Sequence, residues 1–199
     1  MTNKRGLFWS VAALSLAAII SPARADDSKE AVRAVAKDYA AAVAAHDTDK
    51  MRALVSSNST DLVNALIGLL SKYKVLDDAS QAKFNTKISP ASQTESYAGL
   101  DSADIQITHD TAVVTPPKVD GKMSKPITLK NENGSWKVDI TAAIHNRDGV
   151  IKMFGIAGEV AASTAQEITD GKYNSAEDAK NAYYDNVKKA YQQATMPKQ

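Results

Sequence analysis

The feature that most constrains the fold is a central stretch of alternating apolar and polar residues, which lies between segments with helical periodicity. Ile105 and Ile107 alternate with polar neighbours, and residues 111–115 read TAVVT, which is rich in β-branched side chains. The alternation returns in residues 127–130 and 135–140, on either side of a glycine-containing loop. We therefore predict four consecutive strands that form one antiparallel meander.

The turns between these strands predict their register. A turn at His109-Asp110 places the apolar residues of the first two strands on one face, with Ile107 opposite Ala112 and Ile105 opposite Val114. A four-residue loop at residues 131–134 sets Leu129 against Trp136 and Ile127 against Val138. In this register Lys137 and Asp139 point away from the core.

The segment before the strands predicts three helices. The first follows a capping box at residues 27–30, and its periodicity places Tyr39 and His46 on the buried side. Thr48 is expected to cap a short second helix, and a third begins at Ser59 or Thr60. The third helix carries two adjacent apolar stripes, Leu62/Leu66/Leu69/Tyr73/Leu76 and Val63/Ile67/Leu70. Because this apolar arc is wider than a surface helix needs, either two layers cover it or it faces a partner or an apolar cavity.

The segment after the strands predicts two more helices. One has an apolar stripe that includes Met153 and Ile168 and ends at Gly171, and the other begins at Ser175 and buries Tyr183. The order predicts an α+β fold in which helices pack on a curved antiparallel sheet. We expect an α+β domain over residues 26–141 and a C-terminal helical extension over residues 142–199. The extension is expected to pack on the same domain, where it can lie over the open face of the sheet.

The first 25 residues have the pattern of a secretory signal peptide. Lys4 and Arg5 precede an apolar run over residues 6–20, and residues 23–25 form an Ala-x-Ala cleavage site. We therefore expect export to the periplasm or the extracellular space. No other apolar run is long enough to span a bilayer, so no membrane span is expected after cleavage.

Composition excludes several classes of function. The chain contains no cysteine, which rules out disulfides and thiol catalysis. Loss of the leader removes three cations and takes the formal net charge from +1 to −2, so there is no electrostatic case for nucleic acid as a partner. No glycine-rich phosphate loop or G-x-S-x-G serine setting is present, and we expect no cofactor.

Three segments resemble the nuclear transport factor 2-like superfamily, which includes ketosteroid isomerase, scytalone dehydratase and polyketide cyclases. They are the helix AVRAVAKDYAAAVAAHDTDKMRALV, the strand pair ADIQITHDTAVVT and the hairpin PITLKNENGSWKVDIT. The resemblance covers roughly residues 27–141 by general pattern. It implies a cone in which a bent sheet wraps around a long helix, with a pocket at the wide end. The C-terminal helices depart from this pattern.

The resemblance draws attention to Tyr39, which occupies the place where isomerases of this group put an oxyanion-hole tyrosine. That chemistry also needs a general base on a strand after the second helix, and the segment SSNSTDLVNALIGLL offers only Asp61, at a helix start. A second, protonated acid has no clear match either, because Asp110 lies at a turn and Asp139 alternates away from the core. If the protein is an enzyme, Tyr39 and His46 are the candidate catalytic residues. The simpler interpretation is that Tyr39 is a core residue without a catalytic role.

The remaining candidates favour binding over catalysis. His46, His109 and His145 are isolated, without the spacing of a metal site, and His46 suits a helix C-terminus. A pocket between helices and sheet would be lined by apolar and aromatic side chains, namely Tyr39, Val43, Leu66, Tyr73, Leu129 and Trp136. The simpler interpretation of Trp136 is that it fills the core.

Three hypotheses follow from these patterns. The first is an exported, non-catalytic module that binds a small apolar ligand or an envelope protein. The second is an acid–base enzyme of the isomerase, dehydratase or cyclase type that uses Tyr39 as a donor. The third is a structural protein that forms a homodimer through the wide apolar stripe and the terminal helices.

Overall fold

The computed structural model describes residues 29–90, 99–118, 125–142 and 144–195. The signal-peptide pattern and the first two residues of the capping box at residues 27–30 lie outside these residues. The described part has an α+β fold, as the sequence predicts, with helices before and after a four-stranded antiparallel sheet. Within the described residues, no helix is long and apolar enough to cross a membrane.

The sheet is a simple meander with the strand order β1-β2-β3-β4. Its strands are β1 (Asp104–Thr108), β2 (Thr111–Thr115), β3 (Ile127–Glu132) and β4 (Ser135–Val138). The register of β1 and β2 confirms the prediction, since Ile107 pairs with Ala112 and Ile105 with Val114. On their shared apolar face Ile105, Ala112 and Val114 are buried and Ile107 is half-buried, while Gln106 and Thr108 on the other face are exposed.

The predicted register of β3 and β4 is wrong by two residues. Leu129 pairs with Val138 and Asn131 with Trp136, because the loop contains only Asn133 and Gly134. Both loop residues have positive φ, +52° and +88°, which is the geometry of a tight type I′ hairpin. A shift of two residues keeps every side chain on its face, so the apolar residues are still buried on the predicted side.

Helix α1 (Lys29–Ala45) packs across all four strands and closes the apolar face of the sheet. Tyr39 is buried there, but the expectation for His46 is wrong, because His46 is exposed. It lies one residue beyond the helix, with φ +54°, so its left-handed backbone turns the side chain away from the helix face. Asp47, not Thr48, then caps α2 (Thr48–Leu54), and its carboxylate accepts a hydrogen bond from the Lys50 amide.

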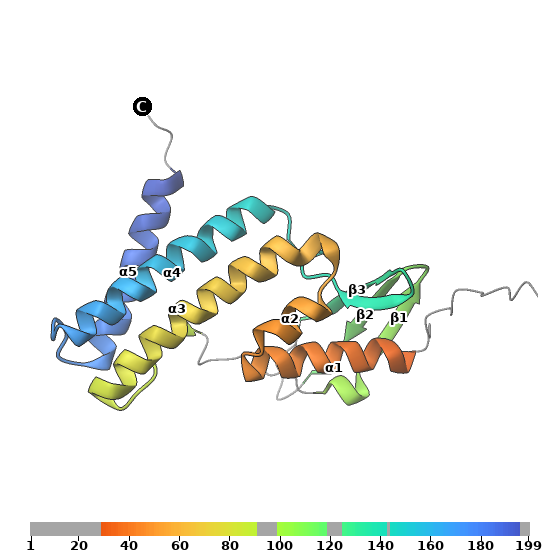
Figure 1. Ribbon diagram of the computed structural model, residues 1–199, viewed down its shortest axis with the longest axis horizontal. Helices are drawn as coiled ribbons and strands as arrows, with labels where there is room; N and C mark the ends of the chain where they lie inside the picture. Colours follow the sequence, from red (N-terminus) through yellow and green to blue (C-terminus); the bar gives the residue numbers. More distant parts are fainter. Residues whose placement is uncertain (1–28, 91–98, 119–124, 143, 196–199) are drawn as a thin grey trace, which may run out of the picture.

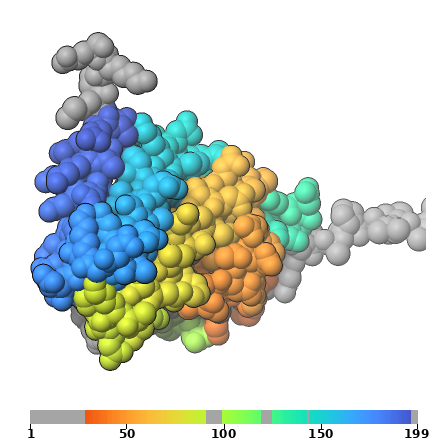
Figure 2. Space-filling view, turned by 60° about the vertical axis from the view of Figure 1, so that its left-hand side comes forward, coloured from red at the N-terminus to blue at the C-terminus, as the bar shows by residue number. Residues whose placement is uncertain are grey.

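The wide apolar arc of the third helix is covered by two layers. Helix α3 (Thr60–Phe84) follows the 3₁₀ turn η1 (Ser57–Ser59). Val63 and Ile67 pack in the cluster formed by α1 and the sheet, whereas Tyr73 and Leu76 pack in a second cluster with the C-terminal helices. Leu70 contacts both clusters. Figure 2 shows α3 between α1 and α2 on one side and α4 and α5 on the other.

The C-terminal helices α4 (Arg147–Thr169) and α5 (Ala176–Thr195) pack beside α3 and do not lie over the sheet. Helices α3 and α4 are parallel neighbours, because Arg147 pairs with Asp61 at their N-terminal ends and Lys83 Nζ donates to the Ile168 carbonyl at their C-terminal ends, at 3.2 Å. Gly171, with φ +83°, ends α4 as predicted. Met153, which was expected inside, is 40% exposed.

Candidate functional site

The interior between α1 and the sheet collects five of the six side chains that were expected to line a pocket. Tyr39, Leu129 and Trp136 are buried there, and Val43 and Leu66 pack against them half-buried. Tyr73 lies in the second cluster, where its hydroxyl is 2.8 Å from that of Tyr183 on α5. The pattern that put Tyr73 on the same stripe as Leu66 gives no signal that the two residues face different layers.

Trp136 is the residue of this interior that carries a buried polar atom without a partner among the described residues. It comes from β4, is 5% exposed and faces the side of the sheet that α1 covers. Its Nε1 donor is buried, and within the described part of the chain it has no hydrogen-bond partner. Because a buried donor without an acceptor costs about 1–3 kcal/mol, such groups are rare in folded proteins. The indole therefore offers an unused donor inside an apolar surrounding.

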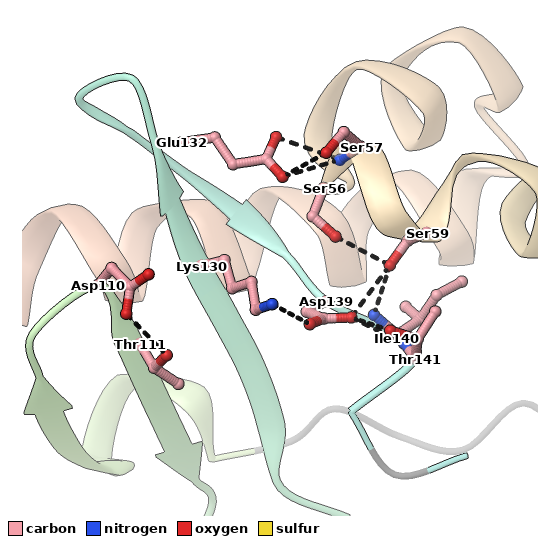
Figure 3. Close-up of polar contacts among 10 residues, drawn as sticks. All are labelled: Ser56, Ser57, Ser59, Asp110, Thr111, Lys130, Glu132, Asp139, Ile140 and Thr141. Atoms are coloured by element: carbon pink, nitrogen blue, oxygen red, sulfur yellow. Dashed lines mark hydrogen bonds and ion pairs between the residues drawn. The ribbon is translucent and has the colours of Figure 1, made fainter. Parts of the chain in front are cut away.

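A junction of polar groups holds β4, and thus Trp136, at the start of α3. Residues 55–56 run beside the free edge of β4: Val55 forms a parallel bridge with Val138, and the Ser56 amide donates to the Val138 carbonyl at 2.9 Å. Figure 3 shows how the side chains of η1 then meet the end of β4. This edge of the sheet is thereby covered at the end of β4.

Asp139 is the centre of the junction. It lies opposite Thr128 on the face of the sheet that carries Lys130, away from the apolar face as expected. It is nevertheless only 6% exposed, because Ser59 and Thr141 pack against it there. Its Oδ1 accepts from the Thr141 amide at 3.0 Å, from the Thr141 hydroxyl at 2.5 Å and from the Ser59 hydroxyl at 3.3 Å. Its Oδ2 lies 3.7 Å from Lys130 Nζ. Both oxygens of the carboxylate are thus occupied.

Neighbouring contacts extend this junction toward the surface. The buried hydroxyls of Ser56 and Ser59 are 3.0 Å apart, and Ser59 also accepts from the Ile140 amide at 3.1 Å. Glu132 accepts from the amide and hydroxyl of Ser57 at distances from 2.8 to 3.1 Å. Ser56 and Ser59 are fully buried, so their hydroxyls form a structural clamp and are not accessible nucleophiles.

Sequence reasoning missed Ser59 and Asp139 as a pair. The available local signal was the triplet Asp139-Ile140-Thr141 at the end of a predicted strand, since aspartate accepts hydrogen bonds from the backbone two residues ahead. The contribution of Ser59 had no local signal, because it comes from a residue 80 positions away in the chain.

The three histidines do not gather into a site. His46, His109 and His145 are all exposed, and His46 and His109 have positive φ at a helix end and in a hairpin turn. The residues that the structure describes contain no group of three or more histidine, cysteine or acidic side chains that could hold a metal ion. Asp61 lies in the first turn of α3, where it pairs with Arg147 and its negative charge interacts favourably with the positive end of the helix dipole.

The tyrosines of the second cluster have perturbed acidity for a structural reason. Burial raises the pKa of Tyr73 and of Tyr183, whose rings meet edge to face at 6.1 Å. At the end of α4, burial and a hydrogen bond to Glu167 raise the pKa of Tyr173 to about 12. A hydrogen bond from Lys172, which has the largest effect, and a second one from Tyr173 lower the pKa of the Glu167 carboxyl. These shifts keep the phenols protonated. The hydrogen bond between Tyr73 and Tyr183 links α3 to α5, and the one from Tyr173 to Glu167 links the segment after α4 to that helix.

Comparisons with known proteins give no significant match for this chain among family models, curated proteins or solved structures. The nuclear transport factor 2-like resemblance therefore stays a prediction from sequence pattern.

Proposed function

We propose that the chain is an exported, non-catalytic binding module, and that its ligand is a small apolar molecule with a hydrogen-bond acceptor. The observation that carries the proposal is the buried Nε1 donor of Trp136, which has no acceptor within the described residues. Indole is a donor only, so it gains a hydrogen bond from any oxygen or nitrogen acceptor that reaches it. A ligand with such an acceptor relieves the cost of the unpaired donor.

The surroundings of Trp136 support an apolar ligand. Tyr39, Val43, Leu66 and Leu129 belong to the same cluster and supply aromatic and aliphatic surface. Ligand sites of this kind combine apolar walls with a few fixed polar groups, and the indole N–H of Trp136 is such a group on this side of the sheet. Export is supported by the pattern of the first 25 residues.

The absence of an evident acid–base pair supports binding over catalysis. Among the described residues Asp139 is the one buried carboxylate, and its oxygens face Ser59, Thr141 and Lys130. An isomerase-type reaction with Tyr39 as donor needs a carboxylate within hydrogen-bond reach of the substrate. The acid–base alternative is therefore the weaker proposal.

A thermal-shift screen with matched ligand pairs tests the binding proposal. Each pair consists of an apolar ketone or fatty acid and a hydrocarbon of the same size without the acceptor, for example 2-acetylnaphthalene and 2-isopropenylnaphthalene. We expect the acceptor-bearing member to raise the melting temperature more, with about 3- to 10-fold tighter binding for one net hydrogen bond. The variant Trp136→Phe keeps the aromatic bulk and should lose this preference.

Two results count against the proposal. One is a screen in which no member of any pair stabilises the protein. The other is a Trp136→Phe variant that folds, by its circular dichroism, and still prefers the acceptor-bearing ligands to the same degree.

An envelope protein partner is the second candidate, favoured by the exposed aromatic residues of α5. Tyr184 and Tyr191 are 42% and 40% exposed and lie seven residues apart, which places them on one face of the helix. Changing both to alanine should abolish capture of a partner from the envelope fraction, whereas changing the exposed Glu177 to alanine should not. Equal capture by both variants would exclude this surface.

A further inference from the structure

The two edges of the sheet differ in a way that points to a partner. The β4 edge is covered at Val138 by residues 55–56, as the Val55–Val138 bridge shows. Within the described residues, β1 at the opposite edge pairs with β2 alone. Figure 1 shows β1 as the outermost strand of the sheet. An open edge presents backbone N–H and C=O groups that can pair with another strand.

β1 lacks the features by which edge strands usually avoid such pairing. Its sequence is Asp104-Ile-Gln-Ile-Thr108, without proline or lysine, and its register with β2 is continuous over all five residues, without a bulge. Asp104, at the end of the strand, is its one charged residue. A regular, nearly uncharged edge strand is a template for intermolecular pairing.

The hairpin geometry shows which groups face the open edge. Thr108 and Thr111 flank the two-residue turn His109-Asp110, so they form a hydrogen-bonded pair, and such pairs alternate along the ladder. Gln106 and Asp104 therefore direct their backbone groups toward β2. Ile105 and Ile107 direct theirs toward the open edge.

The strand is self-complementary in one antiparallel register. With Gln106 of two copies opposite each other, Ile105 of each copy meets Ile107 of the other, and Asp104 meets Thr108. The two Ile105–Ile107 pairs are then hydrogen-bonded pairs, and no like charges are opposed. Ile105 and Ile107 lie on the apolar face in each copy, so the two apolar faces join on the same side.

We propose that the protein forms a symmetric homodimer in which β1 pairs antiparallel with β1 of a second copy, centred on Gln106, to give a continuous eight-stranded sheet. A contact of five residues on each side is small compared with the interfaces of permanent dimers, so the association is weak and depends on concentration. This surface is separate from the interior around Trp136, and the proposal does not depend on the proposed ligand.

Sedimentation equilibrium across roughly 10 µM to about 1 mM protein tests the association, because weak interfaces populate the dimer only in this range. We expect a reversible increase in mass toward that of the dimer. Gln106→Lys places two like charges at the centre of the contact and should abolish the increase. Ser135→Lys adds the same charge to an exposed position on the other edge strand and should leave it unchanged.

Cross-linking tests the register. Since the chain contains no cysteine, Gln106→Cys introduces a single thiol. In the proposed dimer, the two Cα atoms of this non-hydrogen-bonded pair are about 4.5 Å apart, within the range of a disulfide. Mild oxidation should give a covalent dimer much faster for Gln106→Cys than for the control Ser135→Cys.

Three results would overturn the proposal. The first is a strictly monomeric protein at every concentration. The second is a dimer that Gln106→Lys does not weaken, which places the contact on another surface such as α5. The third is equal cross-linking of the two cysteine variants.

Discussion

At the scale of single residues, Asp139 and Trp136 represent opposite solutions for a buried polar group. Asp139 uses both carboxylate oxygens, with three donors at Oδ1 and Lys130 near Oδ2. Trp136 lies three residues earlier, in β4, and leaves its donor unused within the described residues. The satisfied group stabilises the fold, and the unsatisfied group is where we place ligand recognition.

The first prediction concerns Asp139. Asp139→Ala removes the acceptor of three hydrogen bonds and leaves the Ser59 and Thr141 donors without their partner, so we expect a loss of about 2–4 kcal/mol in the free energy of unfolding. Asp139→Asn keeps one acceptor oxygen and should lose less. Urea denaturation followed by circular dichroism measures both.

The control for this prediction is Asp101→Asn, which removes an ion pair with Lys37 at the surface. That carboxylate is 84% exposed, so its replacement should leave the urea midpoint almost unchanged. Equal losses for Asp101→Asn and Asp139→Ala would contradict the central role of the buried junction.

The second prediction concerns the buried phenols. Burial raises the pKa of Tyr183 and Tyr73 above the unfolded value of 10.0, so the native state holds these protons more tightly than the unfolded chain does. The resulting stability is fully present below pH 10 and is lost as the pH rises above 10, by up to about 1.4 kcal/mol per pH unit for each phenol.

Tyr183→Phe removes one of these phenols and should make the decline in stability above pH 10 less steep. The measurement is the urea midpoint at a series of alkaline pH values for both proteins. A parallel decline in the variant would show that Tyr183 does not contribute to the pH dependence.

At the scale of secondary-structure elements, local chemistry predicted most helices, the β1–β2 register and the helix stop at Gly171. The β3–β4 register was missed because the loop Asn131–Gly134 fits either a four-residue or a two-residue turn. The observed turn has left-handed backbone at Asn133 and Gly134, and the ladder extends to Glu132 and Ser135. Apolar patterning cannot separate these registers, because a shift of two residues leaves both faces unchanged.

The third prediction compares glycines in two elements. Gly134 has φ +88°, a conformation that costs an L-residue about 1–2 kcal/mol, so Gly134→Ala should destabilise by that amount. Gly68 is exposed within α3, and a Cβ at that position would meet nothing within 4 Å. Gly68→Ala should therefore stabilise by about 0.5–1 kcal/mol.

Thermal denaturation of the two variants measures these opposite shifts under one set of conditions. Stabilisation by Gly134→Ala would contradict the tight turn between β3 and β4. Destabilisation by Gly68→Ala would show that α3 is more crowded there than the structure indicates.

At the scale of the whole molecule, α3 joins two apolar clusters, one shared with the sheet and one with α4 and α5. These two layers explain the wide apolar arc of α3, but they do not follow its stripes, since Leu66 and Tyr73 share a stripe and pack in different clusters. The sequence could not show this division, because the parallel packing of α4 on α3 depends on contacts about 85 residues apart. The same limit applies to the site. Patterning placed Tyr39, Leu129 and Trp136 inside, yet it could not show that Asp139 is drawn toward Ser59.

The most direct test of the account is the indole N–H resonance of Trp136 in a ¹H–¹⁵N correlation spectrum. In the full chain with Trp9→Phe, Trp136 is the sole tryptophan, whether or not residues 1–25 are removed. The account predicts that an acceptor-bearing apolar ligand shifts this resonance downfield, whereas its hydrocarbon counterpart does not. An indole resonance that no ligand moves, in a protein whose stability those ligands nonetheless raise, would contradict binding at Trp136.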